Sequence, residues 1–116
     1  MGGSASLVLF ALNAAGLAKT TAFVTDGQLS GLCLKGLTVA EVHPEAATGG
    51  PIGKVRDGDT IRISVANRSI DVELSAADLV NREGVGFRVP ASGYLDTFRH
   101  DVRDMSTGGV LLPAKE

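Results

Sequence analysis

An apolar run that passes directly into a polar bend occupies residues 22–31, AFVTDGQLSG. The first part, residues 22–25, predicts a short buried strand. Ser30 follows in a bend between Gly27 and Gly31, where glycine permits backbone angles that a side chain forbids and leaves room for another group. A hydroxyl placed there is presented to its surroundings. The alternative interpretation is a strand that ends in an ordinary polar turn.

Upstream of this strand, the pattern predicts a helix over residues 6–15. Leu7, Phe10, Ala11 and Ala14 recur at helical spacing, and a glycine at position 16 is a suitable stop. We expect this apolar face to pack on the sheet.

Downstream, short β-branched and alternating runs predict a meander of strands. Ser75 precedes Asp78 by three positions, which is capping-box spacing and opens a helix. We expect strands at residues 37–42, 52–55, 60–65 and 70–74, turns at 56–59 and 67–68, one helical turn at 45–47, and helices at 76–82 and 94–105. These elements favour a mixed α/β fold with a small β-barrel and flanking helices.

Composition limits the function classes. The chain has 116 residues, enough for one domain with a core of small aliphatic side chains. Aromatic residues make up only 4% and the formal net charge is −2. Binding of nucleic acid needs a basic surface and often aromatic stacking platforms, so we expect no nucleic-acid partner.

Cys33 is the only cysteine, which excludes an internal disulfide and a multi-cysteine zinc or iron-sulfur site within this chain. A reducing compartment is therefore expected, and we predict a cytoplasmic location. Residues 7–12 are apolar but too short to cross a bilayer, and no cation precedes Lys19, so neither export nor a membrane anchor is expected.

Three further motifs follow the serine bend in order: HPEAA at 43–47, GGPI at 49–52 and RDGD at 56–59. Together the four motifs resemble the C-terminal domain of the dihydroxy-acid and 6-phosphogluconate dehydratase family, over about residues 12–110. The resemblance implies a swivelling domain of the aconitase-like β/β/α type. It would span residues 5–116 as the single C-terminal domain of a larger dehydratase, with residues 1–4 as a tag-like start.

The resemblance implies that Ser30 is the catalytic base that removes a proton from the carbon next to the substrate carboxylate. Thr25, Asp26, Gly27 and Gly31 would position the loop or the substrate. A serine hydroxyl is a very weak acid, so its alkoxide needs a nearby cation. In the family, an N-terminal domain supplies an iron-sulfur cluster and magnesium, and we expect this chain to bind neither.

The implied partners are that N-terminal domain, a hydroxy-acid substrate and a second subunit in a full-length homodimer. Two positions depart from the family pattern. Ser4 falls where a glutamate metal ligand is expected, and Gln28 stands where relatives more often carry arginine.

Different segments indicate different branches of the family. The 14 positions from Ser30 to Pro44 resemble the 6-phosphogluconate branch, whereas the tail, with Gly93, Tyr94 and Leu95, resembles the dihydroxy-acid branch. We favour the second, a hydro-lyase of branched-chain amino acid biosynthesis. An alternative of another class is a non-catalytic β-barrel module that binds a protein through an apolar patch at Leu29, Leu32, Leu34 and Leu37.

Other polar residues have ordinary interpretations. We expect His43 to be structural, His100 to be solvated, Cys33 to be a small core residue, and Asp57 with Asp59 to form a hairpin turn rather than a calcium loop. For Asp26, a simple Asx turn is an alternative to a role in holding the loop. The cations Lys35, Lys54 and Arg56 could attract an anion, but a solvated face is expected.

Overall fold

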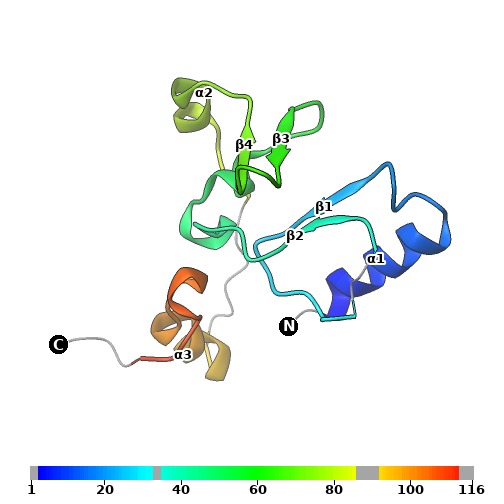
Figure 1. Ribbon diagram of the computed structural model, residues 1–116. Coiled ribbons are helices and arrows are strands. Elements are labelled where there is room, and N and C mark those ends of the chain that lie inside the picture. Colours follow the sequence, from blue (N-terminus) through cyan, green and yellow to red (C-terminus); the bar gives the residue numbers. More distant parts are fainter. Residues whose placement is uncertain (1–2, 33–34, 86–91, 113–116) are drawn as a thin grey trace.

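The computed structural model describes residues 3–32, 35–85 and 92–112. Within these ranges it forms a mixed α/β arrangement of short helices and two small sheets (Figure 1). Cys33 and Leu34, for which the sequence predicted a core position and an apolar patch, lie outside the described residues.

Helix α1, Gly3–Ala14, leads into strand β1, Ala22–Val24, which pairs in parallel with β2, Leu37–Val39. Figure 1 shows α1 lying along one side of this strand pair. The predicted helix and both predicted strands are confirmed, although β2 ends three residues earlier than expected.

Strands β3, Ile61–Ser64, and β4, Ser69–Val72, form an antiparallel hairpin in which Ile61 is opposite Val72 and Ile63 is opposite Ile70. The alternation of apolar residues predicted this pairing correctly. The predicted turn is also confirmed, and it holds Arg68 at a φ of 51°.

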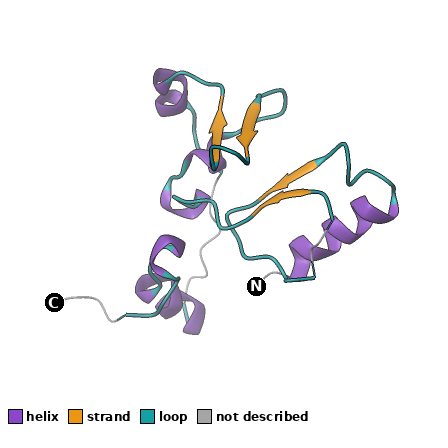
Figure 2. Cartoon of the chain, in the orientation of Figure 1, coloured by secondary structure: helices purple, strands orange, loops and turns teal. Residues whose placement is uncertain are grey.

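The predicted small barrel is wrong for the described residues: the two sheets are separate, and each has two strands (Figure 2). One reason is that most of the strand predicted at residues 52–55 belongs instead to the 3₁₀ helix η2, Pro51–Lys54. Proline in the first turn favours a helical start. The backbone N–H of Gly53 donates to the carbonyl of Gly50, which closes the 3₁₀ turn. The turn at 56–59 forms, but it joins η2 to β3 and is not part of a hairpin.

Helix α2, Ala76–Asn81, begins as the sequence predicts. The Ser75 hydroxyl accepts the N–H of Asp78 at 3.1 Å and donates to its carboxylate at 2.6 Å. The end of the helix is fixed by Arg82, whose guanidinium binds both carboxylate oxygens of Asp59. This ion pair holds α2 against the turn before β3, and it lowers the pKa of Asp59 chiefly through the hydrogen bond from Arg82.

Helix α3, Tyr94–Asp101, ends four residues before the predicted end. Val102 instead forms an isolated antiparallel bridge with Leu111, and the chain between them contains the 3₁₀ helix η3, Met105–Thr107. The helical spacing of apolar residues continues to Val102, but the backbone there is extended and forms the bridge to Leu111.

The expected aliphatic core is sparse. Among the described residues, Leu9 is the one large apolar side chain that is mostly buried, at 7% exposure. The chain exposes 8682 Å², whereas a compact monomer of this mass exposes about 6000 Å². The prediction that the apolar face of α1 packs on the sheet is also wrong. Leu7 and Phe10 are 69% and 47% exposed, and Ala11 and Ala14 are exposed too.

Candidate functional site

The serine bend and the segment after β2 lie at the same edge of the parallel strand pair. Both follow the carboxyl ends of their strands, which is where open parallel sheets usually bind ligands. Backbone hydrogen bonds join the two segments beyond the strands: Val42 N–H donates to Thr25, and Glu41 N–H donates to Gly27. Glu41 adopts a φ of 57°, which is uncommon for a residue with a side chain.

Thr25 stabilises the start of the bend. Its Oγ1 accepts the backbone N–H of Gly27 at 3.0 Å, and its own N–H donates to the carbonyl of Val39 in β2. The hydroxyl therefore forms a local turn and is half-buried at the strand end.

Asp26 reaches out of the bend. Its Oδ2 accepts the backbone N–H of Ala46 at 2.9 Å, at the first residue of the 3₁₀ helix η1, Ala46–Thr48. The structure thus shows a contact of Asp26 that neither interpretation predicted. The carboxylate links the bend to the segment after β2.

Ser30 is exposed, and two hydrogen bonds define its position. Its Oγ accepts the backbone N–H of Leu32 at 3.3 Å, and its backbone N–H donates to the hydroxyl of Ser6 at 3.4 Å. Ser6 is only 4% exposed and ties the bend to α1. Sequence reasoning missed Ser6, and the available signal was weak: a hydroxyl in a mostly apolar helix.

The two flanking glycines do not take the left-handed backbone angles that we expected. Neither Gly27 nor Gly31 has a φ in that region. A Cβ added at Gly31 would meet no heavy atom within 4 Å. The part of the prediction that holds is the open space: the backbone beside Ser30 is accessible to an approaching group.

Glu45 and Gly50 stabilise the segment after β2 that Asp26 contacts. Glu45 Oε1 accepts the N–H of Met105 at 2.6 Å, and this bond is the main reason that the pKa of Glu45 lies below its ordinary value. Gly50 is buried, and its N–H donates to the carbonyl of Glu45 at 2.9 Å. A Cβ at Gly50 would lie 1.7 Å from the carbonyl oxygen of Pro44, so only glycine fits.

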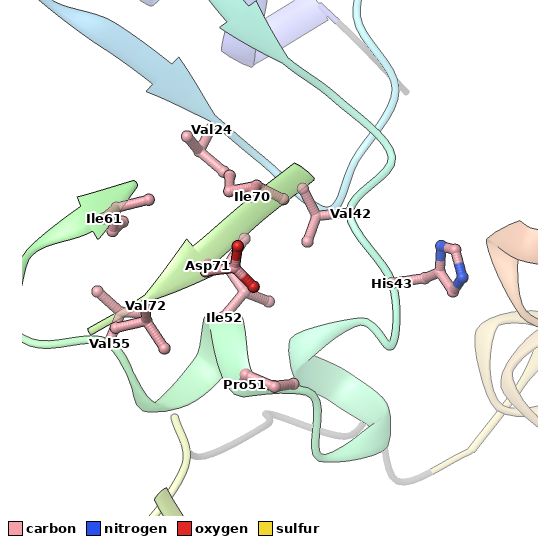
Figure 3. Close-up of a pocket in the computed structure, with 10 residues that line it drawn as sticks. All are labelled: Val24, Val42, His43, Pro51, Ile52, Val55, Ile61, Ile70, Asp71 and Val72. Carbon is pink, nitrogen blue, oxygen red and sulfur yellow. The ribbon is translucent and has the colours of Figure 1, made fainter. Parts of the chain in front are cut away.

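A cavity of about 150 Å³ lies between β1, η2 and the β3–β4 sheet (Figure 3). Its lining is mostly branched aliphatic, with Val24, Ile52, Ile61 and Ile70 among the residues around it. His43 stands at the rim, and Figure 3 shows its imidazole pointing away from these side chains. His43 is exposed, so no catalytic contact for it is found within the described residues.

The described residues do not bring together three or more histidine, cysteine, aspartate or glutamate side chains in a cluster that could hold a metal ion. Asp57 is exposed in the turn, and the Asp59 carboxylate is occupied by Arg82. Gln28 is exposed beside the bend. No helix in the described part of the chain is long and apolar enough to span a membrane.

Residues 4–109 match the family model for the C-terminal part of dihydroxy-acid and 6-phosphogluconate dehydratases. The chain belongs to this family. It is similar to a dihydroxy-acid dehydratase of Anaeromyxobacter dehalogenans strain 2CP-C, with 45% identity over 83% of the chain, and to one of Halothermothrix orenii, with 40% identity over 87%. Dihydroxy-acid dehydratase 1 of Methanosarcina acetivorans is 35% identical over 87% of the chain.

In each of these three relatives the match covers 18% of the relative's length. The chain therefore spans about a fifth of the length of these relatives. The match also includes the whole candidate site, from the serine bend to Gly50.

Proposed function

We propose that this chain acts as the C-terminal domain of a dehydratase, cytoplasmic and homodimeric in its full-length form, that removes water from a 2,3-dihydroxy acid. A dihydroxy acid is favoured over a sugar acid, because the relatives named above are all dihydroxy-acid dehydratases, and the proposal takes this acid to be branched. The domain is of the swivelling type in this proposal, and it covers an active site that is completed by another part of the protein.

In the proposed step, Ser30 Oγ takes the proton from C2 of the substrate while the bond from C3 to its hydroxyl breaks. The electrons of the C2–H bond form the C2–C3 double bond, and the proton and hydroxide together account for one water. The resulting enol carries the C2 hydroxyl and tautomerises to the 2-keto acid.

The observation that carries the proposal is the geometry at Ser30. The side chain is exposed, and the N–H of Leu32 points at its oxygen. A hydrogen bond to the ionised form of a group lowers its pKa, so this N–H stabilises the alkoxide. Thr25 and Asp26 fix the bend through Gly27 and Ala46, and Gly31 leaves the approach open.

One backbone N–H is not enough to ionise a serine near neutral pH, so the proposal assigns the further positive charge to a group outside the described residues. The described residues do not fit an iron-sulfur cluster or a magnesium ion, since they contain no cluster of three suitable ligands. We therefore assign these groups to the rest of a full-length dehydratase.

The second candidate substrate is a sugar acid such as 6-phosphogluconate, because the family model includes that branch and the spacing from Ser30 to Pro44 resembles it. A non-catalytic binding module is favoured by exposed Leu32 and Leu37, at 73% and 42%. The exposed patch does not separate the two classes, because a domain that covers an active site also exposes an apolar surface when alone.

The test is a chimeric enzyme in which residues 4–109 replace the matched segment of the Anaeromyxobacter dehalogenans dehydratase. Ser30→Ala should lower kcat/KM by about 10²–10⁴-fold, the usual contribution of a general base. Ser69→Ala is the matched control, since Ser69 is an exposed serine on β4, and it should keep full turnover. Equal turnover of both variants would remove Ser30 from the mechanism. Turnover of 6-phosphogluconate in preference to dihydroxy acids would select the other branch.

A further inference from the structure

The last described segment of the chain, residues 92–112, contacts the candidate site through Glu45. Oε1 of Glu45 accepts the backbone N–H of Met105 at 2.6 Å, and the two residues are 60 positions apart in the sequence. Met105 is the first residue of η3, and Figure 1 shows the segment that contains α3 next to the turns that follow β2. A hydrogen bond to a carboxylate is about twice as strong as one between neutral groups, so this bond ties the two segments together.

The carboxylate of Glu45 depends on this donor. Its other oxygen, Oε2, is buried and has no hydrogen-bond partner among the described residues. The bond from Met105 is also the largest cause of the lowered pKa of Glu45. Loss of the donor to a partly buried carboxylate is costly, so the side chain of Glu45 is held at the position of Met105.

The backbone of Glu45 sets the direction of the next N–H. Glu45 is extended, with a ψ of 157°, and the N–H of Ala46 donates to Oδ2 of Asp26 at 2.9 Å. The peptide unit is planar, so rotation about ψ of Glu45 turns that N–H with it. A side chain held by Met105 limits this rotation. The bond from Met105 therefore stabilises the contact between Ala46 and Asp26.

The serine bend is held from two sides. On one side Ser6 accepts the N–H of Ser30 at 3.4 Å, and on the other Asp26, four positions before Ser30, accepts the N–H of Ala46. The first bond is long for an N–H donor, whereas the second has ordinary length and a charged acceptor. Asp26 is therefore the firmer of the two anchors.

We propose that Glu45 is a positioning residue for the serine base, and that the segment of α3 and η3 acts on the base through it. The inference rests on the proposed function. The contacts lead from Met105 to Glu45, then from Ala46 to Asp26 in the bend. Glu45 touches neither the substrate nor the proton in this role, but it keeps the serine hydroxyl in place. An error of about 1 Å in such a position can lower a rate by about 10²-fold.

The test is Met105→Pro in the chimeric enzyme described above. Proline has no N–H to donate to Glu45, and it fits the first residue of a helical turn. Asp104 before it has a ψ of 149°, the extended conformation that a residue before proline adopts. The matched control is Met105→Ala, which removes the side chain and keeps the N–H.

We expect Met105→Pro to have a kcat about 10–10²-fold below that of Met105→Ala, with KM within about twofold, because proton removal is affected and substrate binding is not. Both variants are assayed well below their melting temperatures, so that unfolding does not lower kcat. A purely structural role of Glu45 predicts a lower melting temperature for Met105→Pro and equal kcat. Equal kcat, or a change confined to KM, would overturn the proposal.

A second pair of variants leaves Met105 unchanged, in case proline prevents folding. Glu45→Gln keeps an oxygen for the Met105 N–H and Glu45→Ala does not. The glutamine variant should have a kcat about tenfold above that of the alanine variant. Equal kcat in this pair contradicts the positioning role.

A double-mutant cycle tests whether the effect passes through Asp26. Asp26→Ala removes the contact between the bend and Ala46, so Met105→Pro should lower kcat little further in that background. Reductions in kcat that multiply, as they do for independent sites, would contradict this route.

Failure of the positioning role can be told apart from failure of the base assignment. If Ser30→Ala loses turnover but Met105→Pro matches Met105→Ala, the base stands and the positioning role fails. Amide hydrogen exchange over residues 25–31 reports the contacts without turnover, and it should be faster in Met105→Pro than in Met105→Ala. If this difference is found and Ser30→Ala keeps full turnover, the contacts stand and the base assignment fails.

Discussion

Replacing Gly50 by alanine should disrupt the tightly packed segment after β2 that Asp26 contacts. The added Cβ would lie 1.7 Å from the Pro44 oxygen, 2.4 Å from the Pro44 carbonyl carbon and 2.8 Å from the Glu45 oxygen. Real Cβ contacts are not shorter than 3.0 Å, so the backbone must shift by about 1.3 Å. All three atoms belong to the main chain, and no side-chain rotation can relieve the clash.

The shift lowers the free energy of unfolding through three contacts. Overpacking in a tight site typically costs about 1–3 kcal/mol, and loss of the hydrogen bond from Gly50 N–H to Glu45 adds about 1 kcal/mol. The displacement also pulls Ala46 from Asp26, which adds about 1 kcal/mol more. We expect a loss of about 3–5 kcal/mol in the free energy of unfolding, which is a large part of the stability of a small domain.

The assay is urea unfolding of the chain, followed by circular dichroism. Gly84→Ala is the control, because the nearest heavy atom to a Cβ there is 3.9 Å away and its φ is not left-handed. This variant should unfold within about 0.5 kcal/mol of the parent. A Gly50→Ala variant that unfolds at the same urea concentration as the control would refute the packing described around Pro44.

Three other variants test separate contacts. Glu45→Gln should weaken the dependence of stability on pH at acid pH. The pKa of Glu45 is lowered in the folded chain, so its carboxylate stabilises the fold above the pKa of the unfolded state, and this stabilisation is lost as pH falls through the pKa of the folded state. Melting temperatures from pH 3 to 7 measure this loss. Arg82→Met should have the same sign of effect, because the pKa of Asp59 is lowered chiefly by its hydrogen bond from Arg82; melting that keeps the parent's full acid dependence would contradict the ion pair. Gly31→Val should leave the melting temperature of the chain within a few degrees of the parent but lower the turnover of the chimera by about tenfold or more, because the open space beside Ser30 is filled; equal turnover would show that nothing approaches there.

Local patterns predicted local structure well. Ser75 caps α2 as its spacing from Asp78 predicts, although its hydroxyl and not its backbone N–H donates to the Asp78 carboxylate. The alternation of Ile61, Ile63, Ile70 and Val72 gave the β3–β4 hairpin. Each of these depends on residues that are close in sequence, so the pattern contains all the information needed.

Predictions that depend on distant partners were weaker. Residues 52–55 have the composition of a strand, but Pro51 and the close packing of Gly53 against Ala46 favour a 3₁₀ turn. The helical spacing in α1 located an apolar face correctly, but this face is exposed and is not packed on the sheet as predicted. Periodicity tells which side of a helix is apolar, and it does not tell what covers that side.

The candidate site was predicted in part. The exposed Ser30 and its open neighbour Gly31 agree with the sequence, whereas the contacts of Asp26 with Ala46 and of Ser6 with Ser30 join residues 20 and 24 positions apart. No spacing rule within one sequence indicates such hydrogen bonds.

The most direct test of the central claim follows the hydrogen on C2 of the substrate. In the chimera, a dihydroxy acid deuterated at C2 should be dehydrated more slowly than the protonated acid, because Ser30 Oγ removes that nucleus. Ser30→Ala should slow this reaction by about 10²–10⁴-fold, and it should slow exchange of the C2 hydrogen with deuterated solvent to a similar degree. A Ser30→Ala enzyme that dehydrates at the parent rate, with the same isotope effect, would contradict the assignment of Ser30 as the base.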